Sequence, residues 1–204
     1  MRTGPKYKIC RRLGEGVYEQ CQTPKFQISK SKKLGAKPRK FFRQKTEYGI
    51  QLFEKQKTRF TYGVTNRQLS NYVGRAREGK KAPLPALYQM LERRLDNVVL
   101  KLGFAPTRAA ARQMVSHGHV TVNGKRMSIP SYEVLVGDRV AIRHASRAKF
   151  VSDNTRERME SLRAPSWLAR TEENQGGKVI SLPKEPEGEY IADLSRVLEF
   201  YSRV

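Results

Sequence analysis

Cationic side chains recur at a fixed spacing within residues 107–126, TRAAARQMVSHGHVTVNGKR. Arg108, Arg112 and Ser116 follow one another every four residues, so on a helix they share one face. Small apolar residues occupy the opposite face, where they allow close packing on a preceding helix. We therefore predict that the two arginines face outward, where guanidinium groups can bind the phosphates of a polyanion.

Two further cations, Lys125 and Arg126, follow an Asn-Gly dipeptide that lies between apolar residues. This pattern is typical of a hairpin on a type I′ turn at Asn123-Gly124. Helix and hairpin would then present four cations to a single groove of phosphates. The alternative, a solvated helix face beside a basic turn, is less favoured because rigidly held cations without acidic partners repel one another.

Charge is distributed unevenly along the 204 residues, whose formal net charge is +22. Residues 1–86 hold 22 Lys and Arg against 5 Asp and Glu, whereas residues 146–204 hold 10 of each kind. A polyanion should therefore lie on the first two thirds of the chain, and the last third suits either a protein contact or an ordinary solvated surface. The short helix carries no Asn or Gln pair for base edges, so recognition of RNA shape fits better than the reading of a DNA groove.

Signals for other chemistry are weak. His117 and His119 form an HxH pair without a thiolate or carboxylate cluster to complete a metal site, and Ser, His and Asp residues stand in no nucleophile motif. Cys10 and Cys21 are too few for a disulfide framework or for a four-thiolate zinc site, so we expect reduced thiols. We predict that the protein is not an enzyme.

Hydropathy argues against a membrane partner. No run of 18 apolar residues exists, and the start MRTGPKYKIC lacks the apolar core of a signal peptide. The cations are spread over many short elements instead of one amphipathic helix, which disfavours a membrane surface. We expect a cytoplasmic or organelle-matrix protein.

The N-terminal elements that hold these residues read as basic and mainly helical. Residues 1–46 show little periodicity, so we expect irregular structure that orders against a partner. Residues 47–62 predict a helix, and a capping box at Thr65 with Gln68 starts the next helix, which runs to Gly79. The segment EGKKAPLP reads as a linker.

The remaining elements predict a small mixed domain. Apolar residues between Leu87 and Leu102 recur at helical spacing and predict one helix that ends at Gly103, and Thr107 caps the next helix, which Gly118 ends. Alternating apolar residues then predict a hairpin and a small antiparallel sheet. A charged helix at about 153–163, a stretch rich in Pro, Gly and Glu (172–190) and an apolar closing segment, VLEFY, follow, and Trp167 is interpreted as a packing anchor.

The predicted fold class is therefore α+β, a basic helical N-terminal region plus a domain of two helices packed on an antiparallel sheet. The predicted divisions of the chain are 1–46, 47–86 (completed by 190–204), 87–150 and 151–204.

The stretch LERRLDNVVLKLGFAPTRAAARQMVSHGHVTVNGKR, with VGDRVAI after it, resembles the small RNA-binding domain of the S-four family of bacterial small-subunit ribosomal proteins. YGIQLFEKQKTRFTYGV, GPKYKICRRLGEG and EFYSR resemble the flanks of the same family. The resemblance implies a structural constituent of the small subunit that binds 16S-type rRNA at a helical junction of the 5′ domain during assembly. It also implies a place at the mRNA entry path, neighbours such as proteins S-five and S-three, a role in translational accuracy, and repression of its own messenger.

Family motifs also imply site residues. The RNA-facing motif falls on Arg94, Arg108, Arg112, Ser116, His117, Asn123, Lys125 and Arg126, while Asp96 has a structural role beside an arginine. Further basic residues that the resemblance places against RNA are Arg11, Arg12, Lys37, Arg39, Lys40, Arg43 and Lys45, the last five near the messenger entrance.

One departure from the family concerns zinc. Many relatives hold zinc with four N-terminal cysteines, but here Tyr7 and Phe26 occupy two of those positions and only Cys10 and Cys21 remain. We predict no zinc and no other cofactor, with aromatic packing taking over part of the metal's role.

Two rival functions stay open at this point. The same small domain is appended to RNA-modifying enzymes such as pseudouridine synthases and to a tyrosyl-tRNA synthetase, but neither flank here supplies a plausible catalytic domain. A regulator that binds its own messenger is compatible with the ribosomal role.

Overall fold

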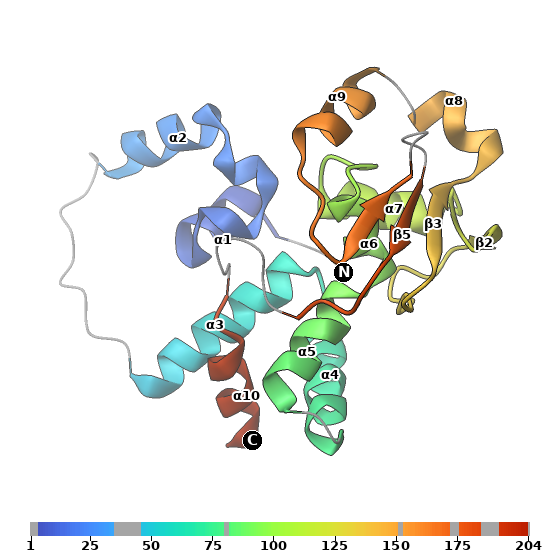
Figure 1. Ribbon diagram of the computed structural model, residues 1–204. Coiled ribbons are helices and arrows are strands. Elements are labelled where there is room, and N and C mark those ends of the chain that lie inside the picture. Colours follow the sequence, from blue (N-terminus) through green and yellow to red (C-terminus); the bar gives the residue numbers. More distant parts are fainter. Residues whose placement is uncertain are drawn as a thin grey trace. The chain divides into compact units, whose positions relative to one another are not determined.

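A computed structural model describes residues 4–34, 46–79, 82–150, 153–171, 176–184 and 192–203 (Figure 1). The chain forms two compact units, residues 1–84 together with 189–204 (unit 1) and residues 85–188 (unit 2). Unit 1 is helical and unit 2 combines helices with a sheet, which confirms the predicted α+β class. No helix among the described residues is long and apolar enough to cross a membrane.

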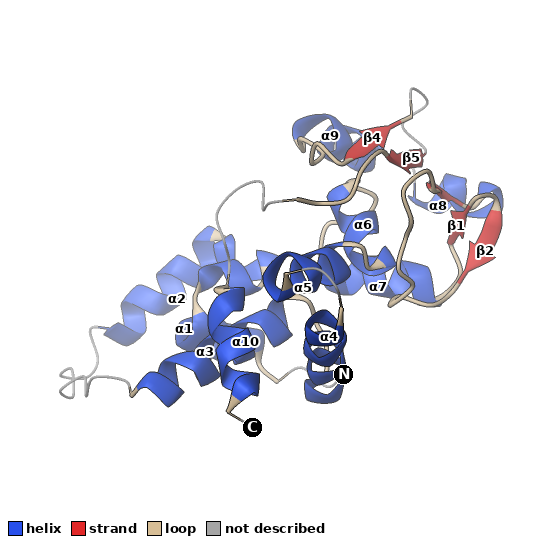
Figure 2. Cartoon of the chain, turned by 60° about the horizontal axis from the view of Figure 1, so that its bottom comes forward, coloured by secondary structure: helices blue, strands red, loops and turns tan. Residues whose placement is uncertain are grey.

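Unit 1 is built from five helices among its described residues, and the last of them comes from the end of the chain. The helices are α1 (Lys6–Leu13), α2 (Pro24–Leu34), α3 (Glu47–Thr61), α4 (Asn66–Glu78) and α10 (Leu194–Ser202), with two 3-10 turns, η1 (Glu15–Val17) and η2 (Glu19–Gln22). Although α10 follows α3 by more than a hundred residues, it packs along α3, and Figure 2 shows the two side by side.

Side-chain caps fix the starts of α3 and α4, and only the second of them was predicted from the sequence. Thr46 Oγ1 accepts a hydrogen bond from the Gly49 N–H at 3.2 Å and caps α3. The capping box of α4 is confirmed, because the Gln68 N–H donates to Thr65 Oγ1 and the Thr65 N–H donates to Gln68 Oε1. These side chains satisfy backbone donors that the first helical turn leaves open.

The expectation of irregular structure over residues 1–46 is wrong for the described part of that segment, residues 4–34. There α1, η1, η2 and α2 enclose a small core of Cys10, Cys21 and Phe26, with Tyr7 and Tyr18 packed against it. Aromatic and sulfur side chains supply this core from short, unevenly spaced elements. Such a core leaves no periodic pattern in the sequence, and for this reason the helices were not predicted.

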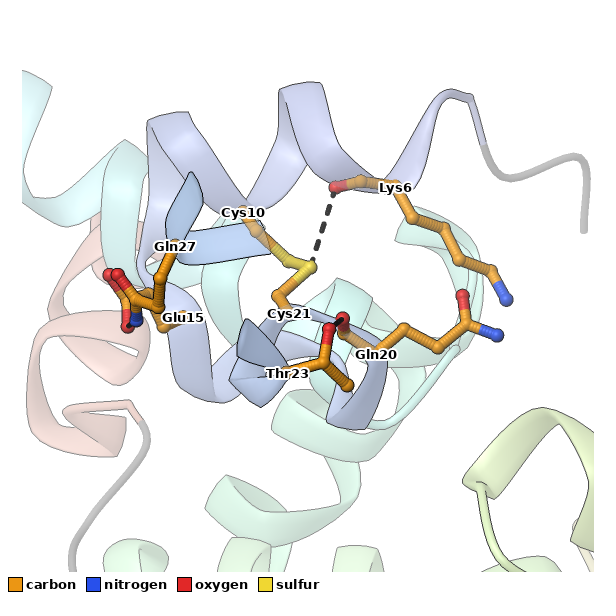
Figure 3. The surroundings of a disulfide bond; sticks show 7 residues. All are labelled: Lys6, Cys10, Glu15, Gln20, Cys21, Thr23 and Gln27. Atoms are coloured by element: carbon orange, nitrogen blue, oxygen red, sulfur yellow. Dashed lines mark hydrogen bonds between the residues drawn. A yellow bond between two sulfur atoms is a disulfide. The ribbon is translucent and has the colours of Figure 1, made fainter. Parts of the chain in front are cut away.

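The expectation of reduced thiols is also wrong, because Cys10 and Cys21 form a disulfide (Figure 3). Their Cα atoms lie 6.4 Å apart, within the range that a disulfide spans. The ring of Tyr7 lies 5.3 Å from that of Phe26, so aromatic packing accompanies the bond. Folding of α1 against η2 brings together two cysteines that are eleven positions apart in sequence.

The first long helix predicted in unit 2 is broken in two. The structure has α5 (Pro83–Glu92) and α6 (Leu95–Lys101), with extended backbone at Arg94, which forms a β-bridge with Glu133. The N–H groups of Leu95 and Asp96 donate to backbone carbonyls of the segment 130–132 instead of to the preceding turn. The apolar spacing continues across this break because both short helices face the same core.

Five antiparallel strands form the sheet of unit 2, in the order β2-β1-β3-β5-β4. The strands are β1 (Val120–Val122), β2 (Lys125–Met127), β3 (Arg139–Ile142), β4 (Leu168–Arg170) and β5 (Gly176–Val179). Asn123 and Gly124 have φ values of 51° and 79°, so the predicted type I′ turn joins β1 to β2.

The sheet extends beyond the predicted boundary at residue 150. β5 pairs with β3, and β4 pairs with β5, so unit 2 continues to residue 188. The stretch 172–190, for which the sequence predicted no strand, therefore contains β5. Two glycines in this segment obscured the strand pattern in the sequence. Packing explains the glycine at position 177, since a Cβ there would lie 2.4 Å from the Leu102 side chain.

Helices cover this sheet and close one hydrophobic core. α6, α7 (Arg108–Ser116) and α9 (Asp153–Ser161) contribute to that core, while α8 (Arg147–Phe150) and the 3-10 turn η3 (His144–Ser146) follow β3. Trp167 is buried in the core, as the sequence predicted.

Candidate nucleic-acid interface

Helix α7 presents its polar residues on one face, as its spacing predicted. Thr107 Oγ1 accepts a hydrogen bond from the Ala110 N–H at 3.2 Å and fixes the start of the helix. Ala111, Met114 and Val115 are buried in the core of unit 2, so the opposite face is left to the polar residues. Ser116 and His117 at the end of the helix are exposed.

A buried carboxylate, Asp96, holds two arginines of this site, whereas the sequence predicted a structural role for it beside one arginine. The side chain of Asp96 has no exposed surface and accepts hydrogen bonds from Arg94 at 3.1 and 2.9 Å and from Arg112 at 3.0 and 2.6 Å. The Arg112 side chain keeps 30% of its surface exposed, whereas Arg94 keeps 2%. This burial contradicts the expectation that Arg94 faces RNA and gives it a structural role.

An amide holds the second arginine of α7 in the same way. Arg108 donates from Nε and from one terminal nitrogen to Asn97 Oδ1, at 3.3 and 2.8 Å. The Asn97 amide in turn donates to the carbonyl and to the carboxylate of Glu92, both at 2.9 Å. Glu92 thus fixes which way the Asn97 oxygen points, and that oxygen orients Arg108.

Neighbouring positions in the sequence explain why both arginines are held. Asp96 and Asn97 are consecutive in the first turn of α6, and Arg112 and Arg108 lie one turn apart on α7. The structural role expected for Asp96 fits this arrangement. The roles of Asn97 and Glu92 in holding Arg108 were not predicted. The sequence signal for them was the run LERRLDN, in which the polar residue Asn97 directly follows Asp96.

The hairpin carries two exposed cations on a turn held by polar contacts. Asn123 donates to Asp138 Oδ1 at 2.7 Å and accepts from the Arg139 N–H at 2.9 Å, so its side chain supports the turn. Lys125 and Arg126 are exposed on β2. Arg126 also donates to the His117 carbonyl at 3.3 Å, which places this guanidinium at the C-terminal end of α7.

A glycine makes room for Arg126 there. Gly118 has a φ of 72°, and a Cβ at this position would lie 2.1 Å from the Arg126 Nε atom. The residue therefore serves two purposes, since it ends α7 in the left-handed region and leaves space for the guanidinium.

His119 is partly buried beside several cationic side chains of unit 2, and its pKa is lowered. Burial lowers its pKa most, and Lys149, His117, Arg126 and Arg143 lower it further. Its Nδ1 atom lies 2.9 Å from Ser146 Oγ, and its ring packs on Phe150 at 4.7 Å. Lys149 and Arg143 were not among the predicted site residues, because each lies in a different element that only the fold brings near His119.

The cations form a row along α7 that ends at the hairpin. Arg108 and Arg112 lie on the helix, and Arg126 lies at its end; at 1.5 Å per residue the helical part of the row, from Arg108 to Ser116, measures about 12 Å. We call Arg108, Arg112, Lys125 and Arg126 the cationic row. Figure 1 shows α7 and β2, which carry it, within unit 2. Guanidinium groups in such a row suit successive phosphates, because each can donate two parallel hydrogen bonds.

The other predicted site residues belong to unit 1 or lie outside the described residues. Arg11 and Arg12 are exposed in the last turn of α1. The segment with Lys37, Arg39, Lys40, Arg43 and Lys45 lies outside the described residues. Within the described ranges, no group of three or more His, Cys, Asp or Glu side chains could hold a metal ion. The absence of zinc stays a prediction.

Two family models together match residues 1–140. The model described as "Ribosomal protein S4/S9 N-terminal domain" matches residues 1–92, and the model described as "S4 domain" matches residues 93–140. The second match covers α6, α7 and the hairpin, and so contains the whole cationic row.

Curated relatives match nearly the full length of the chain. "Small ribosomal subunit protein uS4" of Aquifex aeolicus is 43% identical over 208 residues, and the match covers 98% of both chains. Proteins of the same name from Roseiflexus castenholzii and Methylobacillus flagellatus are 41% and 40% identical, with 98% of this chain and 98% and 97% of theirs covered.

Proposed function

The chain belongs to the uS4 family of small ribosomal subunit proteins, and on that premise we propose that its cationic row binds the phosphate backbone of small-subunit rRNA. As a member of this family it is a structural constituent of the small subunit, and it acts by fixing RNA segments where several of them converge. The affinity comes from phosphate neutralisation, and the fixed geometry of the row selects RNA shape.

The observation that carries this proposal is the pair of buried acceptors behind α7. Asp96 and Asn97 hold Arg112 and Arg108 before any RNA binds. Ordering a long, flexible side chain costs up to about 2 kcal/mol of conformational entropy, and a side chain that is already ordered avoids much of that cost on binding. The acceptors therefore serve to position the arginines for phosphate.

The carboxylates of the chain fit this role better than catalysis. Glu92 and Asp96 are occupied by Asn97 and by two arginines. The described carboxylate whose pKa is shifted is Asp193; burial raises its pKa, but hydrogen bonds from Ser195 and Arg196, with the charge of Arg196, lower it overall. These contacts cap α10, so Asp193 stays ionised as a structural group and supplies no proton.

We further propose the finer roles that the family resemblance implies. They are binding to a helical junction in the 5′ domain of 16S-type rRNA during assembly, contact with mRNA at the entry path, and contacts with proteins S-five and S-three. Roles in translational accuracy and in repression of its own messenger, a cytoplasmic location and the absence of bound zinc complete the proposal. The strongly basic residues 1–86 and the neutral last third support a division between RNA and protein contacts.

The cationic row can be tested by filter binding to a transcribed 5′ domain of 16S-type rRNA. The double variant Arg108→Ala, Arg112→Ala should bind at least tenfold more weakly, a loss of about 1.4 kcal/mol or more. The slope of log affinity against log salt should become shallower by about 0.7–0.9 for each phosphate contact that is lost.

A matched control removes two exposed cations elsewhere in unit 2, in the double variant Arg163→Gln, Lys178→Gln. If both double variants lose affinity equally, net charge alone explains binding and the row has no special part. Binding of the parent chain to an unrelated RNA of equal length as tightly as to the 5′ domain would reject rRNA recognition itself.

A further inference from the structure

One dipeptide of unit 2 can undergo a spontaneous covalent reaction. Asn123 is the only Asn or Asp of the 204 residues that a glycine follows. The backbone nitrogen of the next residue can attack the side-chain amide of an asparagine and expel ammonia. A glycine hinders that attack least, because it has no Cβ. Deamidation of this chain is therefore expected first at Asn123-Gly124.

Solvent reaches this dipeptide in the folded chain. Asn123 and Gly124 are both exposed, and a Cβ at Gly124 would meet no atom within 4 Å. Hydroxide and water, the two co-reactants of deamidation, can therefore approach the amide. Since access is open, the conformation of the turn must set the rate.

The turn holds Asn123 away from the reactive conformation. Asn123 has a φ of 51° and is the first central residue of the type I′ turn, where ψ is small and positive. Deamidation passes through a five-membered succinimide ring, and that ring requires a large negative ψ at the asparagine. The turn between β1 and β2 must therefore open before the ring can close.

Hydrogen bonds to the start of β3 oppose this opening. Asn123 Nδ2 donates to Asp138 Oδ1 at 2.7 Å, and Asn123 Oδ1 accepts from the Arg139 N–H at 2.9 Å. The Asn123 N–H also donates to the Arg139 carbonyl at 2.8 Å. Asp138 is buried and is itself held, because its second oxygen accepts from the Leu135 N–H at 2.8 Å. Both ends of the amide are thus fixed on groups that cannot follow it.

We propose that Asn123 is the deamidation site of this chain, and that its contacts with Asp138 and Arg139 keep it unreactive while the hairpin is closed. In the reaction the Gly124 N–H loses its proton to hydroxide, and the nitrogen bonds to Cγ of Asn123. The Cγ–Nδ2 bond then breaks, and the amide nitrogen takes a proton from water and leaves as ammonia. Water opens the succinimide to aspartate or isoaspartate.

Either product removes the support of the hairpin. Deamidation replaces the Nδ2 donor with a carboxylate oxygen, so two carboxylates face each other where the hydrogen bond to Asp138 now lies. Isoaspartate also adds a methylene to the backbone of the turn. A negative charge then lies beside Lys125 and Arg126 of the cationic row. The resulting loss of RNA binding rests on the proposed function, whereas the reaction itself does not.

The test incubates the full chain at mildly alkaline pH and locates isoaspartate by peptide mapping with mass spectrometry. In urea, isoaspartate should form first in the peptide that holds residue 123, and in the folded chain its rate should be lower by about tenfold or more. Asp138→Ala should raise the rate in the folded chain about fivefold, the size expected for the loss of one hydrogen bond. The matched control is Asp193→Ala, which removes a helix-capping carboxylate of unit 1 and should leave the rate unchanged.

Equal rates in the folded and the unfolded chain overturn the proposal, and so does isoaspartate that forms first at another position. If Asp138→Ala fails to fold, the comparison of the folded with the unfolded parent decides alone. Should Asp138→Ala react no faster than Asp193→Ala, the protective contact with Asp138 is rejected.

The consequence for RNA is measured separately, with the transcribed 5′ domain of 16S-type rRNA as the probe. Asn123→Asp, the product of the reaction, should bind about threefold more weakly than Asn123→Gly, which loses the side chain without adding a charge. Equal affinities reject the effect on the cationic row. Failure of the parent chain to bind this RNA rejects the proposed function, and the isoaspartate measurement still decides whether Asn123 is the deamidation site.

Discussion

The two units hold their cations in different ways. In unit 2, Arg108 and Arg112 donate to acceptors that lie inside the protein, Asn97 and Asp96. In unit 1, Lys55 and Arg59 lie against aromatic rings without a carboxylate partner among the described residues. The two units thus orient these cations by two different kinds of local structure.

This difference has an energetic meaning. The Asp96 carboxylate offsets part of the positive charge of the row, and both acceptors fix its geometry, because a hydrogen-bonded guanidinium in a low-dielectric site has few alternatives. Aromatic rings stabilise a cation more weakly and leave its full charge for a ligand. We therefore expect unit 2 to contribute mainly shape selection and unit 1 mainly charge-driven affinity.

The largest expected effect comes from breaking the acceptor in unit 2. Asp96→Asn removes the buried carboxylate that Arg94 and Arg112 share, and removal of one partner from a buried ion pair costs about 3–5 kcal/mol. Urea unfolding followed by circular dichroism measures this change in the free energy of unfolding.

Glu47→Gln in unit 1 is the matched comparison, because its ion pair with Arg196 is largely exposed, with 54% and 37% of the two side-chain surfaces accessible. Its cost should be below about 1 kcal/mol. Equal costs for the two substitutions would remove the contrast between the units, since the acceptor of unit 2 would then contribute no more than a surface pair.

The second-largest expected effect comes from reduction of the disulfide in unit 1. Reduction of the Cys10–Cys21 disulfide opens a short closed loop, and such a bond stabilises by about 2–4 kcal/mol through the unfolded state. Hydrogen exchange in the presence of a reductant should show faster exchange in α1 and η2, with α6 and α7 unchanged.

The double variant Cys10→Ser, Cys21→Ser serves as the control, because it should respond no further to the reductant. Protection in α1 that persists after reduction would mean that the packing of Tyr7 on Phe26 is sufficient to hold this region. That outcome would assign the stability of the N-terminal segment to aromatic packing alone.

The smallest expected effect concerns His119 in unit 2, whose pKa is lowered mainly by burial and further by nearby cations. The pKa of His119 lies below its ordinary value of 6.5 in the folded chain, so the unfolded chain takes up a proton more readily. The free energy of unfolding should therefore fall slightly as the pH decreases below about 6.5. Urea unfolding at pH 7.5 and pH 5.5 measures the difference, and His119→Gln should reduce it. An unchanged difference in this variant would show that other groups titrate in its place.

Local signals of the sequence predicted many individual elements correctly. The caps at Thr65 and Thr107 and the turn at Asn123-Gly124 depend on a few adjacent residues, and the structure has them where they were expected. Capping and turn geometry follow from the backbone within one or two turns of chain, and for this reason they can be predicted without a fold.

Predictions failed where distant segments meet. The break at Arg94 depends on a bridge to Glu133, the strand β5 depends on pairing with β3, and the disulfide depends on the packing of α1 with η2. None of these partners is visible in a local pattern. Each involves residues that become neighbours only when the chain folds.

The sequence by itself determined that this protein is basic, mixed α+β in class, built for a polyanion, and a member of the uS4 family, because charge, periodicity and long motifs are properties of the linear chain. Only the tertiary structure decided which cations are available to a ligand. It buried Arg94 against Asp96, oriented Arg108 on Asn97, and left Lys55 and Arg59 among aromatic rings. The physical reason is that the charge on a side chain is set by its chemistry, whereas its solvation and its partners are set by what the fold brings beside it.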